Sequence, residues 1–158
     1  MNDILEMLNQ KHIHYKPIHH KRVYTIDEIK VLHLDKEGLI PKNIFLRNAN
    51  GKTHYLITCH PDKKIDMKDL ASKLHSSRLS FASDQRLQKY LNVEKGSVSP
   101  LGFLYDQNHE VIFVFDQELV GQTIGVHPNY NDTTLFLACN DLIKLIENHN
   151  NQVLTIQL

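Results

Sequence analysis

The chain has 158 residues, 41% of them hydrophobic, which is enough for one compact domain with a sizeable core. Its 18 basic and 18 acidic residues balance, which excludes a global field that would hold a long nucleic acid, so any nucleic-acid contact must be local. Cys59 and Cys139 form no metal or redox motif, and because a signal-peptide pattern and an apolar stretch of about 20 residues are both missing, we expect a cytoplasmic protein.

The N-terminal part of the chain predicts two short helices separated by an extended segment. Asn2 can cap the first helix. The apolar face of this helix comprises Ile4, Leu5 and Leu8. Pro17 then marks the break into an extended segment. Thr25 and Glu28 have the spacing of a capping box for the second helix. The apolar face of the second helix comprises Ile26, Ile29 and Leu32.

A β-hairpin is expected next. Residues 42–47 carry the clearest strand signal, because Ile44 and Leu46 alternate with residues that face the other way. Asn50-Gly51 offers a tight turn before a second strand at residues 55–59. The sequence therefore predicts an antiparallel pair of strands.

Two amphipathic helices follow the hairpin. Asp66 caps the first and Ser83 caps the second. Their apolar stripes comprise Met67, Leu70 and Leu74 in the first helix and Leu87 and Leu91 in the second. Between them, residues 79–82 predict a brief strand.

The last third of the chain predicts further strands and one helix. Residues 111–115 form an apolar run that suits the buried middle of a sheet. Later strands are expected at residues 123–126, 135–138 and 153–157. Asn140 is expected to cap a closing helix. Because strands and helices are mixed without a regular βαβ rhythm, we predict an α+β fold, a single domain over residues 1–158 with a mixed β-sheet flanked by helices.

A loop rich in glycine, serine and proline lies between two regular elements. Its composition excludes a helix or a central strand. Glycines allow the backbone to approach a ligand closely, and exposed amides can hold a phosphate or a carbonyl oxygen. The same composition also fits an ordinary tight turn. The loop comprises Gly96, Ser97, Val98, Ser99, Pro100, Leu101 and Gly102.

Lys42 opens the strand at residues 42–47, where a side chain can project into a cleft. Its ammonium group suits a phosphate or a developing oxyanion, although most lysines are simply solvated. In a regular strand Asn43 would point to the opposite face, so both reach one ligand only if the strand begins irregularly.

His127-Pro128 follows a predicted strand, and Asn131 lies just beyond it. Proline fixes the turn and leaves His127 at the strand exit. There the imidazole can contact a substrate or serve as a core or turn residue.

The histidines and cysteines predict neither a metal site nor a nucleophile. His12, His14, His19 and His20 lack a familiar ligand spacing. Cys59 and His60 are adjacent in a strand, so their side chains point to opposite faces and cannot act as a pair.

Several joined motifs resemble the YbaK/ProX prolyl-tRNA editing family over about residues 25–158. They occur in the family's order and at its spacing. The motifs are Lys42 to Asn48, Gly51 with His54 to Leu56, Asp62-Lys63, Arg78 to Ser83, Gly96 to Gly102, and His127-Pro128 with Asn131. The first and fourth of them look like the branch that removes alanine from tRNA for proline.

The resemblance implies a freestanding deacylase with a compact α+β editing fold. It implies Lys42, Asn43 and His127 as catalytic residues, and the loop at residues 96–102 together with Asn131 as the substrate-binding residues. No cofactor or metal is implied. The expected partner is a mischarged tRNA, bound through its acceptor stem and CCA end. Prolyl-tRNA synthetase is a further candidate partner, no membrane is involved, and a monomer is favoured.

Two other functions remain open at this point. One is a deacylase for cysteine, serine or threonine. The other is a noncatalytic module that binds tRNA or a nucleotide on the same scaffold. Release of free amino acid from a panel of mischarged tRNAs separates these functions.

Overall fold

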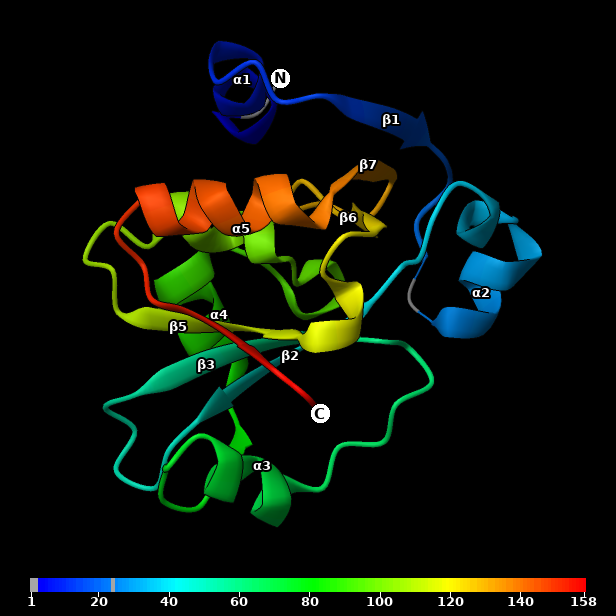
Figure 1. The fold of residues 1–158 in the computed structure, drawn as a ribbon. Helices are drawn as coiled ribbons and strands as arrows, with labels where there is room; N and C mark the ends of the chain where they lie inside the picture. Colours follow the sequence, from blue (N-terminus) through cyan, green and yellow to red (C-terminus); the bar gives the residue numbers. More distant parts are fainter. Residues whose placement is uncertain (1–2, 24) are drawn as a thin grey trace.

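The computed structural model describes residues 3–23 and 25–158, apart from the side chain of Ile26. Helices and strands alternate irregularly along the chain (Figure 1). The α-helices are α1 (Asp3–Gln10), α2 (Ile26–Val31), α3 (Met67–Lys73), α4 (Asp84–Leu91) and α5 (Cys139–Asn148). Short 3-10 helices are η1 (Leu34–Lys36), η2 (Lys95–Ser97), η3 (Pro100–Tyr105) and η4 (Gln117–Leu119). The strands are β1 (Tyr15–His19), β2 (Lys42–Arg47), β3 (His54–Cys59), β4 (Ser80–Phe81), β5 (Val111–Asp116), β6 (Thr123–Val126), β7 (Thr133–Ala138) and β8 (Val153–Ile156).

The strands form two sheets. The larger sheet has the order β4-β2-β3-β5-β8 and is mixed, because β2 is antiparallel to both its neighbours while β3, β5 and β8 run parallel. The smaller sheet, β1-β7-β6, is antiparallel. The predicted α+β fold with a mixed sheet is confirmed. The sequence did not predict the smaller sheet. It depends on the pairing of β1 with β7, which come from opposite ends of the chain.

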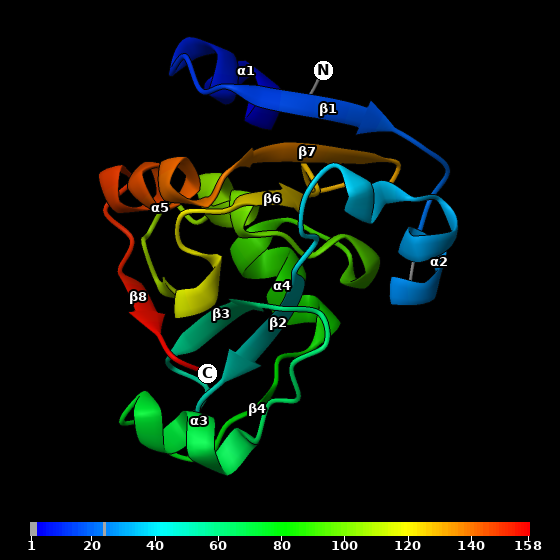
Figure 2. The same ribbon diagram turned by 45° about the vertical axis from the view of Figure 1, so that its right-hand side comes forward.

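Alternation along the central strands separates two apolar layers. Phe45, Leu56 and Phe113 lie side by side in register and belong to the main core, which also includes residues of α4, α5, β6 and β7. Their neighbours in sequence face α3, as expected for a period of two residues. These neighbours are Leu46, Ile57 and Val114, which pack with Leu70 and Leu74 of α3. Figure 2 shows the resulting order, with the small sheet at the top, the large sheet below it and α3 at the bottom.

Three predicted helix caps are confirmed. The Thr25 hydroxyl accepts a hydrogen bond from the Glu28 amide at 3.1 Å. The Asp66 carboxylate accepts two from the first turn of α3, and the Ser83 hydroxyl accepts one from the first turn of α4. Each side chain satisfies an amide that the helix leaves unpaired. The cap expected from Asn2 lies outside the described residues.

The prediction that Asn140 caps the closing helix is wrong. Helix α5 begins at Cys139, directly after β7, and Ala138 occupies the capping position without a side-chain hydrogen bond. Because β7 pairs with β6 as far as Ala138, no loop residue precedes the helix. The Asn140 side chain accepts instead from the amide of Gly121 at 3.0 Å. Within the described ranges, no helix is both long and apolar enough to cross a membrane.

Candidate functional site

A cavity of about 190 Å³ lies where four described stretches of the chain meet: the segment just before α2, the start of β2, the segment around η2 and the end of β6. We call it the Lys42 cavity. Its polar and charged lining comes mainly from the predicted site residues. The lining residues are Val23, Thr25, Ile40, Pro41, Lys42, Asn43, Lys95, Gly96, Val98, Gly125, Val126 and His127.

Gly125 allows β6 to form one wall of this cavity. A β carbon on Gly125 would lie 2.7 Å from Cε1 of Phe136, 2.9 Å from Cγ2 of Thr134 and 3.0 Å from Cγ1 of Ile40. The first two distances are shorter than real contacts of a β carbon, so any side chain here would force its neighbours to shift. The Gly125 amide also donates to the Leu39 carbonyl at 2.8 Å, so β6 lies directly against the segment that leads into β2. The absence of a side chain therefore brings the end of β6 next to the start of β2.

Lys42 is half-buried, and its ammonium group donates a hydrogen bond to the carbonyl oxygen of Lys63. The Lys63 side chain binds the buried Asp116 carboxylate at 2.5 Å and Glu118 at 3.1 Å, and the hydrogen bond to Asp116 is the main cause that raises the pKa of Lys63. Among the described residues, no carboxylate lies within 4.0 Å of the Lys42 ammonium. Lys42 therefore has a fixed position and an uncompensated charge.

Asn43 lines the same cavity despite being the next residue along the strand. Its side-chain oxygen accepts a hydrogen bond from the Thr58 hydroxyl at 2.7 Å, across the pair of strands β2 and β3. This contact uses the amide oxygen and leaves the amide nitrogen as a donor. Both neighbouring residues line the cavity, which lies at the very beginning of the strand.

His127 is neutral near pH 7. Burial lowers its pKa, and the hydrogen bond to the Thr133 carbonyl opposes this only in part. The Nδ1 atom lies 3.1 Å from that carbonyl oxygen, which only accepts, so Nδ1 must carry the ring proton. Nε2 is then an acceptor, suited to a water molecule or a hydroxyl group.

The loop at residues 96–102 contributes to the site only through its first part. Gly96 and Val98 line the Lys42 cavity. Gly96 and Ser97 also line a neighbouring polar cavity of about 340 Å³. The remaining predicted residues, Ser99, Pro100, Leu101 and Gly102, are buried and do not line either cavity.

The second half of this loop, at residues 99–102, holds the first half in place. Ser99 is fully buried, and its hydroxyl accepts from the Leu101 amide at 3.1 Å, which caps η3. A β carbon on Gly102 would lie 3.1 Å from Cβ of Leu91, so this glycine allows close packing on α4. The loop is therefore anchored in the core behind the cavity.

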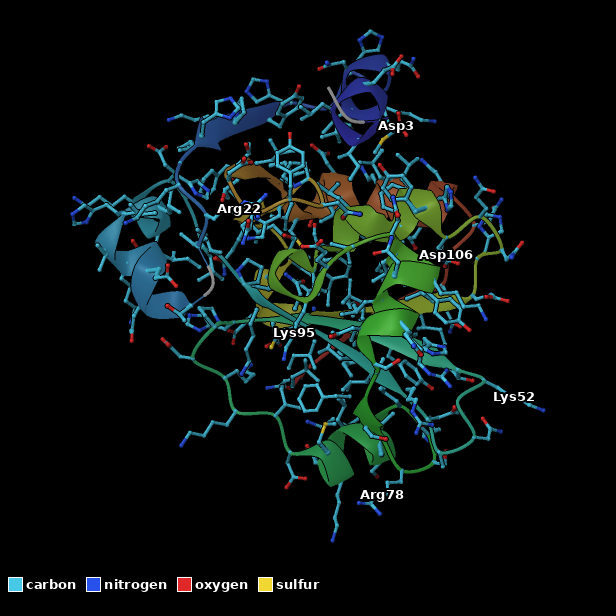
Figure 3. The ribbon with its side chains drawn as sticks, turned by 180° about the vertical axis from the view of Figure 1, so that it is seen from behind. Asp3, Arg22, Lys52, Arg78, Lys95 and Asp106 are labelled. Atoms are coloured by element: carbon cyan, nitrogen blue, oxygen red, sulfur yellow. The ribbon has the colours of Figure 1, made fainter. Side chains whose placement is uncertain are left out.

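Asn131 supports the part of the cavity wall that Val23 forms. Its side-chain nitrogen donates to the Val23 carbonyl at 2.9 Å, and the residue is 4% exposed. Val23 lines the Lys42 cavity, whereas Asn131 lines the neighbouring one. Arg22 of the neighbouring cavity and Lys95 of the Lys42 cavity both lie on the face shown in Figure 3.

Sequence patterns did not single out Thr58, and they gave Lys63, which belongs to the Asp62-Lys63 motif, no role in the site. A signal for Thr58 exists, because a hairpin centred on Asn50-Gly51 pairs residue 43 with residue 58. No local pattern indicates that Lys63 receives the Lys42 hydrogen bond.

Two of the N-terminal histidines and the Cys59-His60 pair have surroundings that do not indicate a metal site or a nucleophile. His19 and His20 lie within hydrogen-bond distance of the hydroxyls of Thr133 and Thr134, at 3.0 and 2.9 Å. Burial raises the pKa of the Cys59 thiol to about 11. His60 accepts instead from the Asp62 amide at 3.1 Å. In the part of the chain that the structure describes, no three His, Cys, Asp or Glu side chains form a group that could hold a metal ion.

Comparison with known proteins gives matches over nearly the whole chain. Residues 20–145 match the aminoacyl-tRNA editing domain family. The chain is 44% identical to the prolyl-tRNA editing protein ProX of Acetoanaerobium sticklandii over 156 residues, which covers 98% of this chain and 95% of that protein. It is 30% identical to prolyl-tRNA synthetase associated domain-containing protein 1 of Danio rerio, covering 92% and 80%.

Solved structures share the fold. A hypothetical protein, APE2540, superposes with a TM-score of 0.76 at 14% identity, covering 99% of this chain and 98% of that one. A candidate trans-editing enzyme for prolyl-tRNA synthetase superposes with a TM-score of 0.72 at 17% identity, covering 98% and 92%. At these identities the likeness concerns the fold alone.

Proposed function

The chain belongs to the aminoacyl-tRNA editing domain family, and we propose that it removes alanine from tRNA for proline in the Lys42 cavity. It is an aminoacyl-tRNA deacylase that edits mischarged tRNA. The choice of alanine is the part that we add. We place its action in the cytosol, with mischarged tRNA as its partner and prolyl-tRNA synthetase as a further candidate.

One observation supports the assignment of the site. Lys42, Asn43, Gly96, Val98 and His127 come from separate stretches of the chain and line one cavity. Sequence motifs alone placed the same residues in one site. An ester needs little more from an enzyme than a bound CCA end, an oriented water molecule and a stabilised carbonyl oxygen.

Each group has a distinct task in the proposed reaction. Lys42 presents a fixed positive charge to the terminal phosphate or ribose, and the amides of Gly96 and Val98 face the ester carbonyl. His127 accepts a hydrogen bond from the attacking water through Nε2, and the Asn43 amide nitrogen orients that water or the ester.

The reaction needs no protein nucleophile. The water oxygen bonds to the carbonyl carbon, the ester bond to the ribose breaks, and the ribose oxygen takes up a proton. The products are free amino acid and uncharged tRNA. The neighbouring ribose hydroxyl is a suitable proton relay, because the described residues that line the cavity include no carboxylate.

The walls of the cavity favour a small apolar side chain. Val23, Ile40, Val98 and Val126 supply apolar surface, and the volume of about 190 Å³ is small. A small pocket excludes a larger residue by steric conflict, whereas a missing methylene changes binding by only about 1–3 kcal/mol. Size exclusion therefore protects proline on its own tRNA, and glycine or serine is rejected less strongly.

The test is release of free amino acid from tRNA for proline charged with alanine, cysteine, serine or proline. We expect the highest kcat/KM for alanine and negligible release of proline. If cysteine or serine is released fastest, that amino acid replaces alanine as the proposed substrate. No release of any of them would mean that the chain binds tRNA without editing it.

A further inference from the structure

Two arginine side chains converge on the turn of the β2–β3 hairpin. A β carbon placed on Gly51 would lie 2.9 Å from Nη2 of Arg86 and 3.3 Å from Nη1 of Arg47. Arg86 comes from α4, so two elements contribute to this arrangement. Lys52, the residue after Gly51 in the hairpin turn, is exposed. We call Arg47, Lys52 and Arg86 the hairpin cluster.

Among the described residues, the hairpin cluster has no acidic partner in direct contact. In the described part of the chain, no carboxylate lies within 4.0 Å of its three cationic groups, whereas Lys16, Lys63 and Lys73 all have acidic partners. The protein as a whole is neutral, so this absence reflects placement and not composition. A surface that keeps cations together without anions is complementary to a polyanion.

Donor groups of the hairpin cluster remain available. Nη1 of Arg86 donates to the Gly51 carbonyl at 3.0 Å and to Nε2 of His54 at 2.9 Å. Nη1 of Arg47 makes only two long contacts of 3.4 Å, to the Asn48 and Ala49 carbonyls. Within the described residues, Nη2 and Nε of both arginines have no acceptor. Such pairs of nitrogen donors fit the oxygens of a phosphate.

His54 does not add to the positive charge. It is fully buried beneath the hairpin, and its pKa falls to about 4, first through burial and then through the charges of Arg86, Lys89 and Arg47. The neutral ring accepts from Arg86 and thereby fixes the direction of that guanidinium group. Arg86 is thus held in place through Nη1, while its Nη2 and Nε remain available as donors among the described residues.

We propose that the hairpin cluster binds backbone phosphates of the tRNA acceptor stem. The inference rests on the proposed function and adds a binding surface outside the cavity. Strand β2 links the two places, with Lys42 at one end and Arg47 at the other. Its five residue steps span about 17 Å at roughly 3.3 Å each. That span suits a CCA end in the cavity followed by the first base pairs of the stem.

The surface also has a suitable orientation. In Figure 3, Lys95 on the cavity rim and Lys52 at the hairpin tip lie on either side of the green helix α4. A nucleic acid that enters the cavity past Lys95 can therefore continue across α4 toward the hairpin.

Binding of uncharged tRNA for proline tests this surface without any turnover. The double variant Arg47→Gln with Lys52→Gln is compared with a control, Lys11→Gln with Lys144→Gln, which removes the same charge from exposed lysines elsewhere. Arg86 stays intact because it contacts buried His54. Affinity is measured between 50 and 200 mM salt, and thermal unfolding verifies that each variant folds.

We expect the hairpin variant to bind at least threefold more weakly than the control. Its plot of log affinity against log salt should be shallower by about 0.9 for each phosphate that the variant no longer neutralises. Equal affinity and slope in both double variants would overturn the proposal.

A kinetic arm separates this proposal from the proposed function. With alanyl-tRNA, the hairpin variant should show a raised KM and an unchanged kcat, and with an alanyl-CCA trinucleotide it should match the wild type. A defect on the trinucleotide would overturn the proposal, because the residues would then act on the cavity. Failure of the proposed function would appear differently, as no alanine release by the wild type.

Discussion

Asn43 and Thr58 face each other across the β2–β3 pair, and the threonine hydroxyl donates to the asparagine amide oxygen at 2.7 Å. Thr58 is buried, whereas Asn43 lines the Lys42 cavity. The threonine thus determines which end of the amide faces the substrate. It acts through Asn43 and is a positioning residue.

Replacing Thr58 with valine keeps the volume and removes the hydroxyl. We expect Thr58→Val to lower kcat for alanine release by roughly threefold to tenfold, because the Asn43 amide loses its fixed direction. KM should change little. Thr58→Ser restores the hydroxyl and should recover most of the rate, which a purely structural role would not predict. Steady-state kinetics of the two variants provide the measurement.

Removal of the Lys42 ammonium should affect the reaction more strongly. Lys42→Ala is expected to reduce the deacylation rate on the order of tenfold or more, because the deleted charge acts on the substrate near the transition state. Lys64→Ala, at an exposed lysine in the loop between β3 and α3, is the matched control and should retain the wild-type rate. Single-turnover assays compare both. An unchanged rate in Lys42→Ala would remove this residue from the mechanism.

Local patterns predict the elements of this fold well where the physical cause is itself local. Thr25, Asp66 and Ser83 cap helices because each lies directly before an amphipathic stretch. Asn140 has the same residue type, but its partner is the Gly121 amide, which only the pairing of β6 with β7 brings near. The β1–β7 pairing escapes prediction for the same reason, since it depends on distant parts of the chain.

Gly125 should resist substitution because of space and not because of its backbone angles. In Gly125→Ala the new methyl group would conflict with Phe136 and Thr134. Overpacking of this kind costs about 1–3 kcal/mol of unfolding free energy. Phe136→Leu removes the nearest atom, so the double variant should recover part of the loss relative to the sum of the two single variants. Urea unfolding of all four proteins measures this coupling, and simple additivity would contradict the steric explanation.

Buried His54 makes stability depend on pH. Its pKa is lowered from 6.5 to about 4, so between these values the unfolded chain binds the proton and the folded chain does not. The free energy of unfolding should therefore fall as pH decreases through this window, by up to about 1.4 kcal/mol per pH unit from this group. Below about pH 4 both states are protonated and this loss ends.

His54→Gln provides the comparison for that pH dependence. Glutamine keeps an oxygen acceptor for Arg86 and cannot be protonated. Unfolding by urea at pH 7.5 and pH 5 should show a smaller difference in the variant than in the wild type. Some dependence should persist, because burial also lowers the pKa of His127. Identical differences in the two proteins would show that His54 does not carry the effect.

The grouping of three motif residues around one cavity was predictable, whereas their contacts were not. Lys42, Gly96 and His127 belong to sequence motifs, and the structure places all three around one cavity. The groups that hold the site residues in place depend on tertiary structure. The Lys63 carbonyl that holds Lys42 belongs to a loop whose path no spacing indicates. Thr58 follows from the hairpin register once the turn at Asn50-Gly51 is taken as its centre.

The size of the cavity should explain why proline is not released from its own tRNA. Val98 lines the cavity and is half-buried, so Val98→Ala enlarges the space without removing a fully buried core residue. We expect release of proline to rise relative to alanine, with the ratio of the two kcat/KM values moving by roughly tenfold, since each methylene contributes about 1–3 kcal/mol to such discrimination. Val120→Ala, at an exposed valine outside the cavity, should leave the ratio unchanged. If Val98→Ala also leaves it unchanged, size exclusion at this wall does not protect proline, and discrimination must come from the tRNA or from another part of the cavity.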